Sequence, residues 1–140
     1  MTFSHPLVTR FSEDNWVSTA DYVPDGEGIE LDSRDETLTQ TLINSEMIPG
    51  ADVVFALGRS VPGEYHIRHH HPTGSEIYYI TKGKMTMYLG DDEFIAEEGM
   101  AIFIPPGTTH ATRNHTDEIC EMVVVCGGPT YASLGLVYDE

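Results

Sequence analysis

The chain of 140 residues has few basic residues and no long apolar run. Its seven lysines and arginines stand against 23 acidic residues, which gives a formal net charge of −16. Such a charge repels the phosphates of nucleic acids and anionic membrane surfaces, so we expect neither nucleic acid nor membrane as a partner. Nowhere do 18 apolar residues run together, and the first 20 residues lack the apolar core of a signal peptide. We therefore expect a soluble, cytoplasmic protein.

Cysteine is also scarce, because Cys120 and Cys126 are the only two. On one strand, residues six positions apart are separated by roughly 20 Å. That distance is too long for a disulfide without breaking the strand, so we predict two buried thiols, as is usual in a reducing compartment.

The length favours one domain, and turn signals divide the chain into two parts. Residues 1–50 contain turn signals at Pro24-Asp25-Gly26 and Pro49-Gly50, and we interpret them as an irregular N-terminal arm with edge strands. Within this part, residues 38–47 are expected to form a short helix. Residues 51–140 alternate β-rich runs with glycine and proline turns, which indicates an all-β sandwich or barrel. The expected strands are residues 53–57, 77–81, 85–89, 93–96, 101–104 and 119–126.

Histidine, by contrast, is concentrated around residue 70. Side chains two apart on a strand share a face, so His69 and His71 can bind one ion while His70 points away. Glu76 follows after a turn, and the segment Pro105-Pro106-Gly107 leads to a fourth candidate, His110. An isolated His-x-His pair is more often a surface feature than a metal site. Three imidazoles and one carboxylate, however, favour a divalent transition metal, for which Fe, Mn, Ni and Zn are candidates.

The spacings of these residues resemble the two motifs of the cupin superfamily. In the first motif, Gly63, His69-x-His71, Glu76 and Gly83 are separated by five, four and six residues. In the second motif, Gly99, Pro105-x-Gly107, His110 and Asn114 are separated by five, two and three residues. The resemblance covers residues 63–114. It implies a cupin-type double-stranded β-helix, or jelly-roll barrel, in residues 51–140, with His69, His71, Glu76 and His110 as the metal ligands.

Strand alternation also indicates which neighbours share the cavity with the ligands. If Glu76 points inward, so should Tyr78 and Ile80, while Tyr79 should face the other side. His66 and His70 should face outward, and a surface position is favoured for His66 over the alternative of a cavity group. A phenol near a cation can have a lowered pKa, so Tyr78 is a candidate catalytic base; the alternative is a tyrosine that only packs in the core. The segment is similar to the ligand region of small cupin lyases that cleave dimethylsulfoniopropionate, in which the corresponding tyrosine is catalytic. The gap between His71 and Glu76 is one residue longer here.

The cupin superfamily contains many activities, so the motifs leave three hypotheses open. The first is an Fe(II)-type dioxygenase acting on a small organic substrate. The second is a redox-neutral, metal-dependent lyase, isomerase or cyclase that uses Tyr78 as its general base. The third is a metal-loaded binding or sensing module without turnover. We rank catalysis above binding, because all four ligands are present and no other domain is attached that would read out sensing.

A homodimer is the expected assembly. An open β-sandwich leaves strand edges that must be covered, and a 50-residue arm with little core of its own needs a surface on which to pack. We expect the arm, including Trp16 and residues 38–47, to contribute to the interface or to close the barrel.

Overall fold

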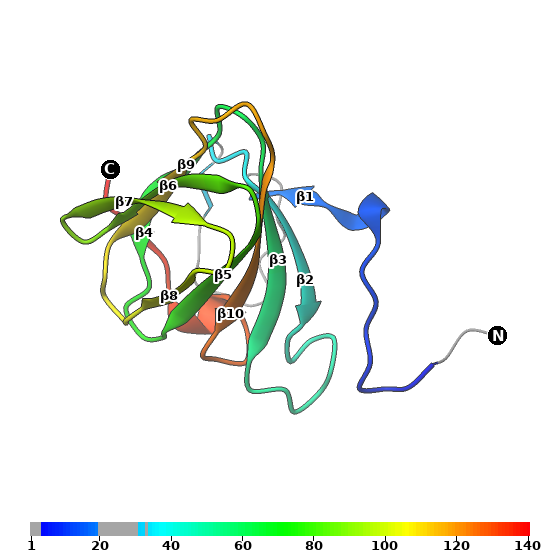
Figure 1. Ribbon diagram of the computed structural model, residues 1–140. Helices are drawn as coiled ribbons and strands as arrows, with labels where there is room; N and C mark the ends of the chain where they lie inside the picture. Colours follow the sequence, from blue (N-terminus) through cyan, green and yellow to red (C-terminus); the bar gives the residue numbers. More distant parts are fainter. Residues whose placement is uncertain (1–3, 20–30, 33) are drawn as a thin grey trace.

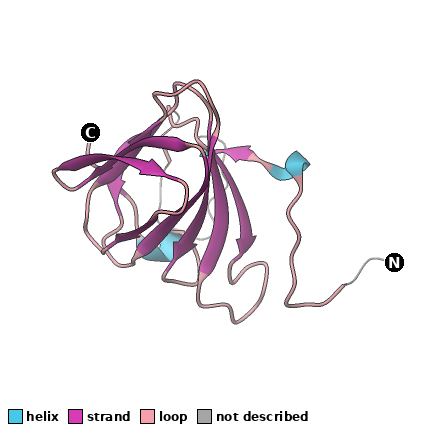
Figure 2. Cartoon of the chain, in the orientation of Figure 1, coloured by secondary structure: helices cyan, strands magenta, loops and turns pink. Residues whose placement is uncertain are grey.

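The computed structural model describes residues 4–19, 31–32 and 34–140, and it consists of two antiparallel sheets packed face to face (Figures 1 and 2). The six-stranded sheet contains, in spatial order, β1 (Val17–Ser18), β2 (Leu38–Ile43), β3 (Val54–Ser60), β10 (Cys120–Cys126), β5 (Glu76–Lys82) and β8 (Ala101–Ile104). The five-stranded sheet contains β11 (Val137–Tyr138), β4 (Tyr65–His70), β9 (His110–Arg113), β6 (Lys84–Leu89) and β7 (Asp92–Glu97). The 3-10 turns η1 (Glu13–Asn15) and η3 (Ala132–Leu134) flank the strands. This arrangement confirms the predicted all-β double-stranded β-helix.

The core lies between the two sheets and is formed by the inward residues of each strand. In β5, burial alternates as expected, with Tyr78 and Ile80 buried while Ile77 and Tyr79 are exposed. The main buried cluster comprises Tyr78, Ile80, Met85, Met87, Ala96, Ile102, Ile104, Cys120 and Met122. Cys120 and Cys126 are both buried and are not joined by a disulfide, as predicted.

The prediction of a helix at residues 38–47 is wrong. Leu38–Ile43 instead forms β2, which pairs along its length with β3. Threonine at positions 39 and 41 favours a strand, and the ladder to β3 satisfies backbone groups that an isolated short helix would leave to water. The chain then makes a single turn, in which the side chain of Asn44 accepts hydrogen bonds from the backbone N–H groups of Glu46 and Met47.

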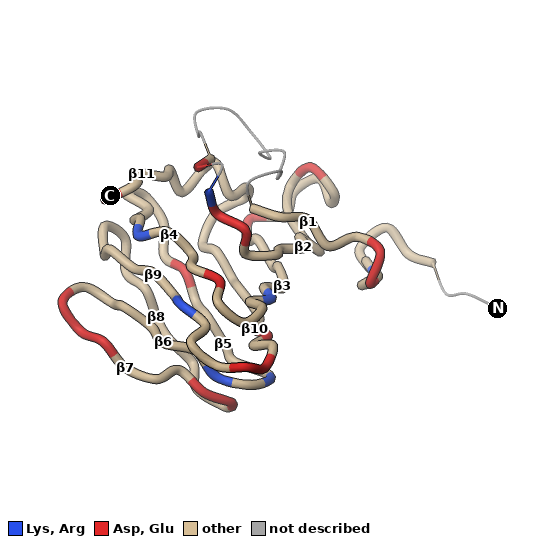
Figure 3. Tube along the Cα trace, turned by 90° about the horizontal axis from the view of Figure 1, so that it is seen from above, with Lys and Arg blue, Asp and Glu red and all other residues tan. Residues whose placement is uncertain are grey.

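The first 50 residues contribute the edge of the six-stranded sheet. β1 pairs with β2, and the backbone of Ser12 exchanges two hydrogen bonds with the side chain of Gln40. The turn expected at Pro24-Asp25-Gly26 lies outside the described residues. Figure 3 shows acidic residues gathered in turns, for example between β6 and β7. Within the described part of the chain, no helix is long and apolar enough to cross a membrane.

Candidate metal centre

The four sequence-predicted ligands meet between the two sheets. His69 lies near the end of β4 and His71 directly follows that strand, while Glu76 begins β5 and His110 begins β9. His69 and His110 are direct partners in the β4–β9 pairing, so strand register alone puts them on one face. One ligand atom from each of the four residues lies within 4.8 Å of the others, and none of the four residues is more than 3% exposed. Position 70 behaves as alternation requires, because His70 turns away and contacts Asp139.

In each of the three candidate ligand histidines, a hydrogen bond at Nδ1 fixes the orientation of the ring. Nδ1 of His69 donates to the carbonyl of Ile67 at 2.6 Å, and Nδ1 of His110 donates to that of Thr108 at 2.9 Å. Nδ1 of His71 donates to the carbonyl of Gly135 at 2.7 Å. A carbonyl only accepts, so these bonds place the proton on Nδ1 and leave the Nε2 lone pair directed into the cluster. That is the tautomer a metal ligand needs.

The cluster passes a test of fit for a cation. Nε2 of His69 and Nε2 of His71 are buried without a hydrogen-bond partner in the protein, a costly arrangement that a bound cation would resolve. Oε1 of Glu76 lies 3.1 Å from Nε2 of His110 and 3.6 Å from Nε2 of His71. Ligand atoms that share one ion at about 2.1 Å are themselves separated by roughly 3.0–3.4 Å. The 3.1 Å spacing lies within this range and the 3.6 Å spacing slightly exceeds it, so small side-chain movements would let one ion contact all three atoms.

Protonation states also suit metal binding. Burial by itself would raise the pKa of Glu76, but hydrogen bonds and charge from His110 and His71 outweigh it and hold that pKa well below its usual range. Burial, together with the neighbouring histidines, lowers the pKa of His69 well below its usual value. An ionised carboxylate and a neutral imidazole are the forms that bind a cation. Burial alone would lower the pKa of His71, but Glu76 raises it above its ordinary value, so a proton held by His71 in the absence of a cation would leave on loading.

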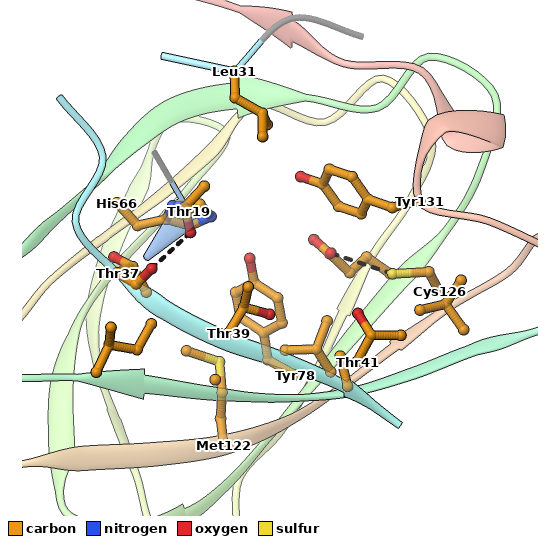
Figure 4. Close-up of a pocket in the computed structure, with 16 residues that line it drawn as sticks. Thr19, Leu31, Thr37, Thr39, Thr41, His66, Tyr78, Met122, Cys126 and Tyr131 are labelled. Atoms are coloured by element: carbon orange, nitrogen blue, oxygen red, sulfur yellow. Dashed lines mark hydrogen bonds between the residues drawn. The ribbon is translucent and has the colours of Figure 1, made fainter. Parts of the chain in front are cut away.

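A small cavity of about 80 Å³ opens beside Glu76 (Figure 4). One wall is apolar and comes from β3 and β10, with Val54, Ala56, Gly58, Met122 and Val124. Beside this wall, the neighbouring strand β2 and its surroundings carry hydroxyl groups, at Thr19, Thr37, Thr39 and Thr41. Among the described residues that line it, none is Lys or Arg. The cavity is therefore mostly apolar, with a row of hydroxyl groups and the ligand Glu76 in its lining.

Tyr78 points its hydroxyl group into this cavity, as Figure 4 shows. Its ring centroid lies 6.0 Å from that of His110, and the side chain is almost fully buried. Burial, followed by the negative charge of Glu76, raises the pKa of Tyr78 well above its usual range. Without a cation the phenol therefore keeps its proton. The general-base role stays a prediction.

Sequence reasoning missed a second tyrosine, Tyr131. It follows β10, and its hydroxyl group enters the cavity from a different side than that of Tyr78 (Figure 4). Its ring lies 5.2 Å from that of His71 in an edge-on arrangement. No spacing signal marked this residue, because its position depends on the turn that brings η3 and Gly135 back onto His71.

The outward, surface position expected for His66 is wrong. His66 lines the cavity, and its ring lies 4.7 Å from that of His69. The β4–β9 pairing shifts register between these two residues, so alternation counted back from His69 fails there. Nδ1 of His66 is held at 2.5 Å by Asp35, a fully buried carboxylate that also accepts from the backbone N–H groups of Thr37 and Ile67.

Comparison with known proteins identifies the family. The family model described as "Cupin domain" matches residues 57–126, half of the chain, and the chain therefore belongs to the cupin family. An uncharacterised protein from Methanocaldococcus jannaschii is 28% identical over 100 residues, which cover 71% of this chain and 79% of the relative.

Many solved structures are similar, including the following two. The polyketide cyclase RemF from Streptomyces resistomycificus is 27% identical with a TM-score of 0.63, over 75% of this chain and 72% of that one. An oxalate oxidase in complex with glycolate has the same TM-score at 20% identity over 73% of this chain, and this chain spans only 54% of its length. The likeness to the oxidase shows the fold alone.

Proposed function

We propose that this protein is a metal-dependent cupin enzyme that cleaves, isomerises or cyclises a small oxygen-bearing substrate without net oxidation. The observation that carries the proposal is the cavity lining. Tyr78, Tyr131 and His66, three side chains that can hold or move a proton, line one cavity together with the ligand Glu76. Proton transfer next to a cation is the chemistry of redox-neutral lyases and isomerases.

His69, His71, Glu76 and His110 would hold the cation. When bound, a divalent transition metal supplies Lewis-acid polarisation of a substrate carbonyl or carboxylate oxygen. Side chains of the protein would move protons and bind the substrate. Tyr78 exchanges a proton at its phenol oxygen with the substrate, and Tyr131 offers a second hydroxyl from the facing side. His66, with its orientation fixed by Asp35, presents its remaining ring nitrogen to the same space.

The size and lining of the cavity limit the substrate. About 80 Å³ accommodates roughly five to eight water-sized groups, which corresponds to a compact metabolite. The hydroxyl of Thr37 is buried without a partner in the protein and borders the cavity, so it is available to bind a substrate oxygen. Arg59 is engaged by Glu13 and Glu121 instead. A lining without Lys or Arg favours a neutral or singly charged substrate over a phosphorylated one.

The similarity to RemF supports a redox-neutral class, since that protein is named a cyclase. Its substrate class does not transfer, because a polyketide is larger than the cavity described here. The first hypothesis from the sequence, an Fe(II)-type dioxygenase, uses the same four ligands. It needs no proton-bearing side chains at the positions of Tyr78 and Tyr131, and this is why we place it second.

The test combines metal analysis with turnover in the presence and absence of oxygen. Protein purified without an affinity tag is analysed for metal, stripped, and reloaded separately with Fe, Mn, Ni or Zn. Each form is incubated with a set of small keto, hydroxy and carboxylic acids, and products are followed by NMR while oxygen uptake is recorded. We expect turnover that continues under nitrogen. Substrate-dependent oxygen consumption would instead establish the dioxygenase, and binding without any chemical change would establish a sensing module.

A further inference from the structure

The two oxygens of the ligand Glu76 have different surroundings. Oε1 lies among the other ligand atoms, 3.1 Å from Nε2 of His110 and 3.6 Å from Nε2 of His71. Oε2 instead accepts a hydrogen bond from Sγ of Cys126 at 3.5 Å, which a dashed line marks in Figure 4. One carboxylate thus contacts the ligand histidines through one oxygen and a thiol through the other.

Strand pairing brings the thiol to this position. Cys126 ends β10 and Glu76 begins β5, and the two residues are direct partners in the β10–β5 ladder. Partners in a ladder extend their side chains from the same face of the sheet. The pairing continues one residue further, because the backbone N–H of Gly127 donates to the carbonyl of Ser75 at 2.9 Å. The contact between thiol and carboxylate therefore follows from the fold.

Packing holds the thiol in place beside the carboxylate. Cys126 is 1% exposed and packs with Val54 and Leu134 in a small apolar cluster. The side chains of these two neighbours offer no hydrogen-bond acceptor, whereas Oε2 of Glu76 lies within reach of the S–H group. A thiol is a weak donor, but a hydrogen bond to a charged acceptor is stronger than one between neutral groups. Cys126 also lines the cavity, so the contact lies where a substrate would bind.

The thiol does not belong to the ligand cluster itself. In the part of the chain that the structure describes, the ligand atoms that lie within 4.8 Å of one another come from three histidines and Glu76, and no cysteine is among them. Cys126 contacts the oxygen of Glu76 that faces away from the histidines. Its effect is therefore on the orientation of a ligand.

The orientation of Glu76 decides how much of a bound ion remains free. A carboxylate can bind a cation through one oxygen or through both. An octahedral ion held by one atom from each of the four residues keeps two open positions, and a second oxygen from Glu76 would close one of them. The hydrogen bond to Cys126 keeps Oε2 away from the ion. Without that bond, a buried Oε2 would gain by turning onto the ion, because an unpaired buried acceptor is costly.

We infer that Cys126 is a positioning residue, which holds Glu76 so that it binds the ion through Oε1 alone and leaves two positions for substrate and water. The inference rests on the proposed function in one respect, the binding of a cation by the four ligands, and it is independent of the reaction. It also narrows the substrate class, because two open positions let one small molecule bind through two of its oxygens, as a hydroxy acid or keto acid does.

The test counts the water molecules on bound Mn(II), which requires neither a substrate nor turnover. The full chain is loaded with Mn(II), loading is verified by metal analysis, and the relaxation rate of solvent protons is measured. Cys126→Val fills the space of the thiol without a donor, Cys126→Ala is a second donor-free variant, and Cys126→Ser keeps a donor. Cys120→Ala is the matched control, because Cys120 is also buried on β10 but its register partner in β3 is Ser60.

We expect two water molecules on the ion in the wild-type protein and one in the donor-free variants, whose relaxation enhancement should fall to roughly half. Cys126→Ser and Cys120→Ala should match the wild type. Circular dichroism establishes that each variant is folded, and either donor-free variant can replace the other.

Donor-free variants that keep the wild-type relaxation would overturn the inference, as would a Cys126→Ser variant that behaves like Cys126→Val. A thiolate-to-metal charge-transfer band in the Co(II)-loaded wild-type protein would also overturn it, because Cys126 would then be a ligand. A wild-type protein that binds no Mn(II) would overturn the metal site of the proposed function as well, and this result is distinct from unchanged relaxation.

Discussion

Oε1 of Glu76 lies 3.1 Å from Nε2 of His110, although β5 and β9 belong to different sheets. A cation held by both residues would tie the two sheets together. At a free metal concentration about 100 times the dissociation constant, one-site binding adds about 2.7 kcal/mol to the free energy of unfolding, which corresponds to a rise of several degrees in Tm. Calorimetry of metal-loaded and chelator-treated protein measures this difference. His110→Ala is the control and should show almost none of it.

Tyr78 is tested by replacing it with phenylalanine, which keeps the ring and its packing. If the phenol moves a proton in a redox-neutral reaction, Tyr78→Phe should lower turnover by about 10²-fold or more while the metal content stays unchanged. If the enzyme is a dioxygenase, the same substitution should matter far less. Measuring kcat and bound metal on this variant decides the question, and full activity would remove Tyr78 from the mechanism.

Glu64 should make stability depend on pH. Burial raises the pKa of this carboxyl to about 7, although it accepts a hydrogen bond from the backbone N–H of Val61. Between about pH 4.5 and pH 7 the folded chain therefore holds more protons than the unfolded chain, so the free energy of unfolding falls as pH rises. Glu64→Gln keeps an oxygen acceptor but cannot ionise, and it should stabilise the protein at about pH 8 much more than at about pH 4.5.

Urea unfolding at the two pH values measures the effect of Glu64→Gln. Glu93→Gln, a substitution at an exposed acid near the β6–β7 turn, is the control and should show no such difference. Equal effects of Glu64→Gln at both pH values would contradict this explanation.

Two turn glycines should differ in their tolerance of alanine. Gly83 has a φ of +72°, and a Cβ there would approach the carbonyl oxygen of Ile119 to 2.5 Å. Gly90 has a φ of +58° but open space around its Cα. We expect Gly90→Ala to cost about 1 kcal/mol for its left-handed backbone, and Gly83→Ala to cost about 1–3 kcal/mol more because of the clash. Denaturant unfolding measures both, and equal losses would contradict the argument.

The sequence was a good guide wherever the chain obeys simple alternation. Because β5 is regular, counting from Glu76 placed Tyr78 and Ile80 inside and Tyr79 outside. The four candidate ligands come together for a related reason, since His69 and His110 are register partners.

The inward–outward alternation rule failed where strand pairing is irregular. Sequence reasoning also missed residues that reach the site through long-range contacts. The register shift in β4 put His66 in the cavity, and no local signal could show that shift. Asp35 and Tyr131 reach the site from segments distant in sequence, so their roles depend on tertiary contacts. Residues 38–47 misled because the apolar residues there are spaced four or five apart, as in a helix, and pairing with β3 decided the outcome.

The most direct test of this account is an anomalous difference map of the metal-loaded protein, collected at the absorption edge of the metal found in it. The account predicts a single peak between the sheets, about 2.0–2.2 Å from Nε2 of His69, His71 and His110, with a carboxylate oxygen of Glu76 completing the protein ligands. A peak bound to His70, or one more than roughly 3 Å from His110, would contradict it.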